Sequence, residues 1–242
     1  MSEDKNIEQS APWPPTYTIK KHTRVRHPKL RVSPHKGLEV IVPVRFSLKQ
    51  LSALLETHKT WIEKKLLNYQ HMITQAAMLP TEIFLPAISQ QYTIHYRQIQ
   101  NERIKIIKRP QNEIVLFGQM NNKILCKKLL LQWIRIQAKQ YLIPWLQQLS
   151  EQTQLTYQEV NIRSQRSRWG SCSSNKVIHL NDRLLFLPPH LVTHVLLHEL
   201  CHTVHFNHSN EFWKLLASFD STWKTNKREL HNFKMNIPAW TY

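Results

Sequence analysis

The chain has 242 residues, with 33 Lys or Arg against 16 Asp or Glu, so its formal net charge is +17 at pH 7. At 41% hydrophobic residues it can bury a core, and no apolar run approaches the roughly 18 residues that a membrane helix needs, so we expect no membrane partner. Three cysteines, Cys126, Cys172 and Cys201, are an odd and sparse set that argues against a disulfide framework. This usage favours a reducing compartment, and we expect a cytoplasmic protein.

The first 120 residues predict a tail followed by a β-rich lobe with one long helix. Residues 1–16 lack both the basic start and the apolar run of a signal peptide, so we expect a disordered tail. In residues 17–120, Ser47 is expected to cap a helical pattern that extends to Leu67. Apolar segments between turn residues predict strands over 17–25, 30–33, 38–42, 83–85, 92–96, 104–107 and 114–117.

A second region, residues 121–242, begins with helical spacing and is expected to hold the functional site. Pro144 should kink or end its first helix. The three glycines of the chain, Gly37, Gly118 and Gly170, are expected where the backbone turns in a way that other residues resist. The two lobes together predict a protein of the α+β class.

The segment His198-Glu199-Leu200-Cys201-His202 carries the spacing of a metal site. Two histidines four residues apart on a helix lie one turn apart on one face, so both imidazoles can reach a single ion. Glu199 projects beside the pair, where its carboxylate can take a proton from a water on the metal without being a ligand. The pattern is typical of a zinc hydrolase.

The surrounding residues support a helix and supply a third ligand. Pro188 and Pro189 favour a helix start, and apolar residues then recur at helical spacing as far as Val204. The third ligand is expected after this helix, at His208. It precedes Ser209, a good N-cap for the next helix, which has Glu211 in its first turn.

Several neighbouring residues have a structural interpretation beside a functional one. His190 and His194 continue the four-residue stripe, but no glutamate follows them, and we interpret them as helix-face histidines. His205 is either a transition-state donor or spare ligand, or a histidine at the surface or behind the ligands. Cys201 is predicted to be buried, and Trp213 to be a core anchor that fixes the turn of the third ligand.

Arg163, Arg166 and Arg168 alternate with shorter residues as on a strand. Arg166 and Arg168 would then share a face, where they either clamp an anionic substrate or reaction oxyanion, or form structural salt bridges. Both interpretations remain open from the sequence.

In this part the chain resembles the YgjP-like zinc metallopeptidases, which are related by motif to the SprT-type and WLM metalloproteases. The resemblance lies in an ordered set of motifs spread over some fifty residues. They are Arg166-Ser167-Arg168-Trp169-Gly170-Ser171-Cys172, Asn181 with Arg183-Leu184, the histidine helix, and Asn207-His208-Ser209 leading to Phe212-Trp213.

The resemblance implies a zincin-like α+β catalytic core with His198, His202 and His208 as zinc ligands and Glu199 as general base. Metzincins share this histidine spacing but have a glycine where this chain has His205. The leading hypothesis is therefore a zinc-dependent peptidase acting on a peptide or protein. Two alternatives are a metal-dependent phosphohydrolase acting on nucleoside triphosphates and a basic nucleic-acid-associated protein with a zinc site.

Residues 20–36 hold basic side chains without one acid. On a strand hairpin they would form a positive face that attracts phosphate backbones of nucleic acid, or a solvated edge that discourages strand pairing. The residues are Lys20, Lys21, Arg24, Arg26, Lys29, Arg31 and Lys36.

Overall fold

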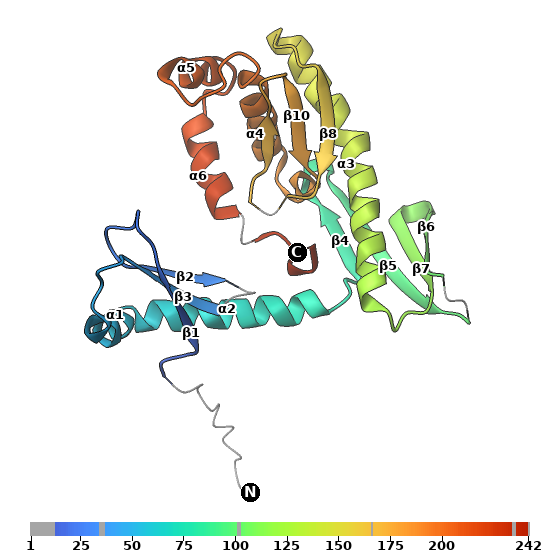
Figure 1. Ribbon diagram of the computed structural model, residues 1–242. Coiled ribbons are helices and arrows are strands. Elements are labelled where there is room, and N and C mark those ends of the chain that lie inside the picture. Colours follow the sequence, from blue (N-terminus) through green and yellow to red (C-terminus); the bar gives the residue numbers. More distant parts are fainter. Residues whose placement is uncertain (1–12, 34–36, 101–102, 166, 234–235, 242) are drawn as a thin grey trace, which may run out of the picture. The chain divides into compact units, whose positions relative to one another are not determined.

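The computed structural model describes residues 13–33, 37–100, 103–165, 167–233 and 236–241, and for 69–77 it describes the backbone alone. The predicted tail thus falls mostly outside the described residues, as does Lys36 of the basic segment. The described chain is mixed α+β, with six α-helices and three small sheets (Figure 1). It forms two compact units, Met1–Ala77 and Met78–Tyr242, which are described in turn.

In the first unit a three-stranded sheet packs on two helices. The central strand β3 (Gly37–Val42) pairs in parallel with β1 (Tyr17–Lys21) and antiparallel with β2 (Lys29–Ser33). The helices are α1 (Leu51–Thr57) and α2 (Lys59–Ala77). The alternation of each strand sends one set of apolar side chains to the helices. The buried members of this core are Val32, Leu38, Val40, Val42, Leu51, Leu55 and Ile62.

The helical pattern predicted after Ser47 is divided. A 3-10 turn, Leu48–Gln50, precedes α1, and the Ser47 side chain makes no capping hydrogen bond. The break between α1 and α2 falls at His58. Just before it, the Thr57 hydroxyl donates to the Ala53 carbonyl oxygen at 2.8 Å, a local bond that bends helices.

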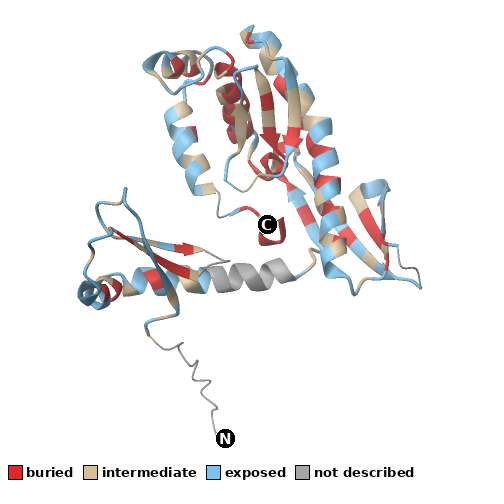
Figure 2. Cartoon of the chain, viewed as in Figure 1, coloured by how far each residue is buried: buried red, intermediate tan, exposed pale blue. Residues whose placement is uncertain are grey.

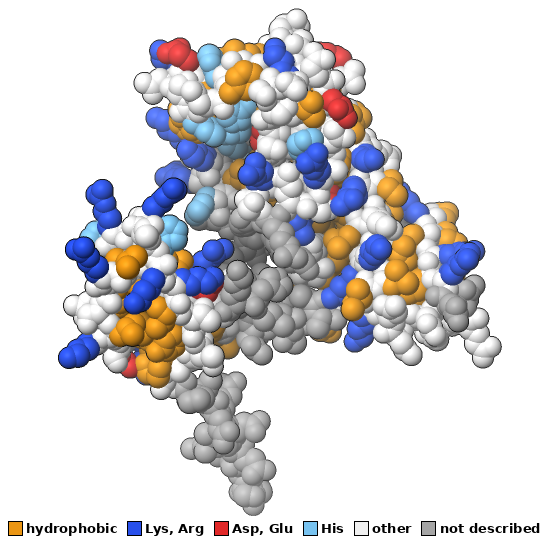
Figure 3. All heavy atoms as spheres, viewed as in Figure 1, with side chains coloured by type: hydrophobic (Ala, Val, Ile, Leu, Met, Phe, Trp, Pro, Cys, Tyr) orange, Lys and Arg blue, Asp and Glu red, His pale blue; other side chains and the backbone are white. Residues whose placement is uncertain are grey.

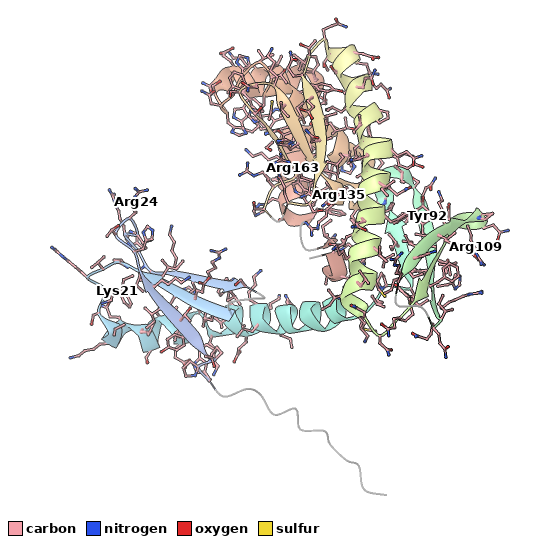
Figure 4. All side chains as sticks on the ribbon, turned by 45° about the vertical axis from the view of Figure 1, so that its right-hand side comes forward. Lys21, Arg24, Tyr92, Arg109, Arg135 and Arg163 are labelled. Atoms are coloured by element: carbon pink, nitrogen blue, oxygen red, sulfur yellow. The ribbon has the colours of Figure 1, made fainter. Side chains whose placement is uncertain are left out.

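The sheet face away from the helices carries the basic side chains. Arg31 pairs in register with Glu39, and Lys20 and Lys29 pair with Ile41, so all of these side chains share that face. Glu39 is buried and forms ion pairs with Lys20 and Arg31. In Figure 4, Lys21 and Arg24 extend outward from this unit. The predicted strand over 17–25 ends at Lys21, and Arg24 and Arg26 follow in the connection to β2.

The second unit begins with a four-stranded sheet in the order β4-β5-β7-β6. Its strands are β4 (Glu82–Leu85), β5 (Gln90–Gln98), β6 (Lys105–Arg109) and β7 (Glu113–Gly118). The sequence grouped these strands with the N-terminal lobe. In the structure their buried residues share one core with the long helix that follows, and Tyr92 meets Trp133 edge-on with ring centroids 4.7 Å apart.

That long helix, α3 (Lys123–Thr153), continues through Pro144. Of the two expected outcomes, a kink or an end at the proline, the end is wrong. Pro144 removes the hydrogen bond to the carbonyl of Gln140, but both residues are exposed, so water can satisfy that carbonyl. On either side, Leu142 and Leu146 are fully buried and hold the helix against the core.

A third sheet and three helices complete the second unit. β10 (Val177–Asn181) pairs in parallel with β8 (Glu159–Arg163) and antiparallel with β9 (Gly170–Cys172). In Figure 1, α3 runs beside β8, with which it is in contact. The helices are α4 (Pro189–Cys201), α5 (Asn210–Phe219) and α6 (Trp223–Phe233), and α4 contacts both of the others and β9.

Figure 2 shows that buried residues concentrate on β10 and α4, while α6 is largely exposed. Cys126, Cys172 and Cys201 are all free, in agreement with the expected lack of a disulfide framework, and Cys201 is buried as predicted. Among the described residues, no helix combines the length and apolar character needed to cross a membrane.

Candidate metal centre

Helix α4 positions the first two histidines. It begins at Pro189, as expected, but ends at Cys201 rather than continuing to Val204. The last turn tightens because the Thr203 amide and hydroxyl both donate to the Leu200 carbonyl oxygen. His202, the C-cap, nevertheless keeps helical angles (φ −68°, ψ −14°), so it still lies one turn after His198.

The third histidine lies at the entrance of α5. The Ser209 hydroxyl oxygen accepts the Phe212 amide at 3.4 Å, so the predicted N-cap is confirmed, and Glu211 lies in the first turn. The Asn207 side-chain oxygen in turn accepts the Ser209 amide at 3.2 Å. This capped turn fixes His208 against α4.

The ring nitrogens of the three histidines converge. The Nε2 atom of His198 lies 3.1 Å from the Nε2 atoms of both His202 and His208. In the described part of the chain this is the one group of three His, Cys, Asp or Glu residues close enough to share an ion. Ligand nitrogens about 2.0–2.1 Å from a tetrahedral zinc ion are about 3.3 Å apart, so the arrangement fits that ion.

The histidines are oriented and neutral, as metal ligation requires. His202 Nδ1 donates to the carbonyl oxygen of His205 at 2.9 Å, which leaves the Nε2 lone pair free to face the other two rings. Burial, together with the neighbouring histidines and Lys227, lowers the pKa of His198 to about 3. Burial also lowers the pKa of His202 and of His208.

Two aromatic rings support this orientation. Phe212 stacks on His202 with ring centroids 4.5 Å apart, and Trp213 stacks on His208 at 5.4 Å. Trp213 is only half-buried and lines the cavity in front of the histidines, so it is more than the core anchor that the sequence predicted. His205 contributes its backbone carbonyl, and its side chain is not part of the histidine group.

Glu199 is buried between α4 and β9. Its side chain is 4% exposed, and its Oε2 atom has no hydrogen-bond partner among the described residues. Burial raises the pKa of this carboxyl to about 8, although the positive charge of Arg168 acts to lower it. A Cβ atom on Gly170 would lie 2.5 Å from Glu199 Oε1, so the glycine is required by this close approach. A buried carboxyl oxygen without a partner, next to three converging nitrogens, fits a site for a metal and its water.

Arg168 belongs to the same cavity, but its placement differs from the prediction. The strand expected to carry Arg163, Arg166 and Arg168 ends at Arg163, because the chain then turns towards β9. Arg166 lies outside the described residues. Arg168 lines the cavity together with Glu199.

Asn181 and Arg183, two residues of the motifs that resemble the family, hold the connection between β8 and β9. This role was not predicted from the sequence. The Asn181 amide donates to the carbonyl oxygens of Gln165 and Arg168, both at 2.8 Å. The buried Arg183 guanidinium donates to the Gln165 carbonyl at 2.8 Å and to the Thr241 backbone. The segment before Gly170 is thereby tied to β10 and to the C-terminal end of the chain.

The interpretation of His194 as a helix-face histidine is corrected by its burial and its partner. His194 is 3% exposed, and its Nδ1 lies 2.7 Å from Asp220 Oδ2. Asp220 also accepts hydrogen bonds from Thr222 and Asn226. Burial alone would raise the pKa of Asp220, but these hydrogen bonds hold it below its ordinary value. His190 is exposed, as predicted, and lies 3.0 Å from Glu229 of α6.

Of the three converging histidines, His198 and His208 line a cavity of about 520 Å³, within the usual size of ligand sites. Figure 3 shows histidine side chains gathered in the second unit with Lys and Arg close by. The cavity residues are Arg168, Trp169, Gly170, His194, Val195, His198, Glu199, His208, Trp213, Lys227 and Leu230.

Comparison with known families agrees with this geometry. A family model described as YgjP-like, metallopeptidase domain, matches residues 26–233, which is most of the chain. No curated protein matches the chain. The match points to a hydrolase with a metal cofactor, in keeping with the three converging histidines. The chain belongs to the YgjP-like family of metallopeptidase domains.

Proposed function

We propose that this chain is a zinc-dependent peptidase with a zincin-like catalytic core. His198, His202 and His208 hold the zinc ion and Glu199 is the general base. One observation carries the proposal: three Nε2 atoms converge beside a buried glutamate whose Oε2 has no partner in the described part of the chain.

Three neutral imidazoles with room for a fourth ligand are the preferred donor set of a catalytic zinc ion. When bound, zinc supplies Lewis acidity and lowers the pKa of the water molecule that it holds towards about 7. The hydrogen bond from His202 Nδ1 to the His205 carbonyl keeps that imidazole in the tautomer that can ligate.

Glu199 moves the proton. Its Oε2 atom accepts a proton as water attacks the peptide carbonyl, and the same carboxyl then donates that proton to the leaving amine. A general base is most effective when its pKa lies near the working pH, and burial brings the pKa of Glu199 to about 8. Gly170 leaves the carboxyl the space that it occupies.

Phosphoanhydride hydrolysis of a nucleoside triphosphate is the second candidate. It is favoured by the charges of the cavity, where Arg168 and Lys227 face a single acid, Glu199. Both candidates use the same base and ligands, and they differ in the electrophile. We place the peptidase first because the chain belongs to a family described by a metallopeptidase domain.

The experiment compares wild type with Glu199→Gln, His208→Ala and His205→Ala, each assayed against unstructured peptides and nucleoside triphosphates side by side. Elemental analysis should find about one zinc per chain in wild type and Glu199→Gln. Turnover by Glu199→Gln should fall by at least about 10²-fold, because an amide cannot accept the proton. Near wild-type turnover by fully metallated Glu199→Gln protein would refute the mechanism for both substrates.

The His208→Ala and His205→Ala variants distinguish a zinc ligand from a histidine that only lies near the site. His208→Ala should lose zinc because a ligand is removed. His205→Ala should retain it, because His205 supports His202 through its backbone carbonyl, which the substitution preserves. Zinc loss in His205→Ala to the level of His208→Ala would instead make His205 a ligand.

A further inference from the structure

Helix α6 carries a stripe of basic side chains beside the histidine site. Lys224, Lys227, Arg228 and His231 follow one another at intervals of three, one and three residues, which places them on one face of the helix. All four are exposed and line a second cavity of about 740 Å³. The one acid of α6, Glu229, is turned to α4, where it pairs with His190.

The two cavities adjoin. Trp169, Lys227 and Leu230 line both of them, so the wall formed by α6 extends from the histidines to the end of the second cavity. No Asp or Glu is among the described residues that line the second cavity, and Glu199 is the one acid in the first. We call this joined space the α6 groove.

The cations of the groove are held in place without being neutralised. Lys227 Nζ lies 4.2 Å from the ring centroid of Trp213, and Lys224 Nζ lies 5.7 Å from that of Trp223. Cation–π contacts of this kind position an ammonium group and leave its charge available. Among the described residues, neither lysine forms an ion pair, nor do Arg168 and Arg228.

We propose that the α6 groove binds acidic side chains of the substrate polypeptide, next to the bond that is cleaved. This substrate preference rests on the proposed peptidase function. The stripe from Lys224 to His231 is about 10 Å long at 1.5 Å per helical residue, which matches about three residues of an extended peptide. The groove therefore selects Asp or Glu within about three positions on one side of the scissile bond.

The aromatic side chains of the α6 groove favour a peptide over a nucleic acid strand as its ligand. Binding of single strands relies on bases that stack on open aromatic faces. Trp213 is stacked by Trp223 at 4.5 Å and by His208 at 5.4 Å, and Lys227 lies over its ring as well. Trp213 is therefore already engaged by two rings and one lysine, and the ammonium group of that lysine suits a carboxylate better than a stacked base.

Binding can be tested without turnover. Zinc-loaded Glu199→Gln protein is titrated with fluorescent peptides of one length whose flanking residues are Glu, Gln or Lys, and anisotropy gives each Kd. The Glu peptide should bind about tenfold more tightly than the Gln peptide at low salt, the product of two exposed ion pairs, and this ratio should approach one at high salt. Lys224→Glu/Arg228→Glu should abolish or reverse the ratio.

A matched control reverses the charge of two basic side chains outside the α6 groove. Lys128→Glu/Lys139→Glu alters two exposed lysines of α3 that line neither cavity, and it should keep the preference of the parent protein. Equal affinities for the Glu and Gln peptides would overturn the proposal. A preference unchanged in Lys224→Glu/Arg228→Glu would do the same.

The possible results distinguish peptide binding in the α6 groove from the proposed peptidase activity. Preferential binding of the Glu peptide without cleavage by zinc-loaded wild type would support the groove and refute the peptidase. If wild type cleaves, kcat/KM for the Glu peptide should exceed that for the Gln peptide by the same factor as the binding ratio. Displacement of the Glu peptide by a nucleoside triphosphate at a concentration well below the peptide's Kd would assign these cations to phosphate and overturn the proposal.

Discussion

Gly170→Ala is expected to impair Glu199, the proposed general base, without removing any functional group. The added Cβ atom would lie 2.5 Å from Glu199 Oε1, 2.7 Å from Cγ and 2.8 Å from Cδ. Ordinary contacts between such atoms lie near 3.5 Å, so the carboxyl must move by about 1 Å or β9 must move away from α4. A displacement of this size at a reacting group lowers turnover by about 10²-fold.

The same overlap has a cost in stability, because Glu199 is buried and has little room to move. Overpacking of this kind lowers the free energy of unfolding by about 1–3 kcal/mol. Glu199→Ala in the same chain removes the atoms that clash, so the double variant should be more stable than Gly170→Ala alone. Chemical denaturation of the four proteins of this cycle measures the coupling between the two positions.

Turnover should show the same coupling. Once Glu199→Gln has removed the base, Gly170→Ala should cause little further loss, while zinc content stays near that of wild type. Gly37→Ala serves as a control because Gly37 has φ +60° and no atom within 4 Å of the added Cβ, so its strain lowers stability without touching Glu199. Gly170→Ala protein with wild-type turnover, or additive effects of Gly170→Ala and Glu199→Gln, would refute the reasoning.

Two further predictions concern other parts of the chain. Asp220→Asn should lower the free energy of unfolding by about 3 kcal/mol at pH 7, since it breaks a buried pair with His194. The pKa of Asp220 is held below its ordinary value, so its contribution to the free energy of unfolding is present above about pH 4 and is lost as the pH falls through the lowered pKa. A difference in stability between wild type and Asp220→Asn that is the same at pH 7 and pH 3 would contradict this. If the basic segment of residues 20–36 binds nucleic acid, neutralising Arg24, Arg26 and Arg31 should flatten the dependence of log Kd on log salt by about 0.9 per lost contact with duplex DNA. A slope unchanged by the substitutions would leave these charges a role in solubility.

The local elements of the site were predictable because short-range chemistry determines them. Pro189 begins α4 and Ser209 caps α5, where the proline ring and the serine hydroxyl favour a helix start. The proximity of His198 to His202 follows from helical spacing alone. His208 was expected from its position before a capped helix, and its Nε2 lies 3.1 Å from that of His198.

Contacts distant in sequence were not predictable in the same way. Nothing near His194 indicates that Asp220, 26 residues later, accepts its hydrogen bond, so the helix-face interpretation was the natural one and was wrong. Gly170 was recognised as a constrained position, but the constraint is the Glu199 carboxyl and not a positive φ. Pro144 was expected to kink or end α3; the helix does not end there, because the packing of its neighbours in a large core outweighs the local preference.

The contacts that hold the candidate metal centre also place the α6 groove. Helix α4 carries His198 and Glu199, and its outer turns are joined to the α6 region by the pairs His190–Glu229 and His194–Asp220. Asn226 of α6 donates to Asp220 as well, so one buried carboxylate connects the histidine helix to the helix that bears the cations. A change at Asp220 should therefore disturb the acidic-peptide preference together with stability. Lys224→Glu/Arg228→Glu should alter mainly the preference, because both side chains are exposed. Such a separation distinguishes residues that recognise substrate from the buried pair that fixes where recognition occurs.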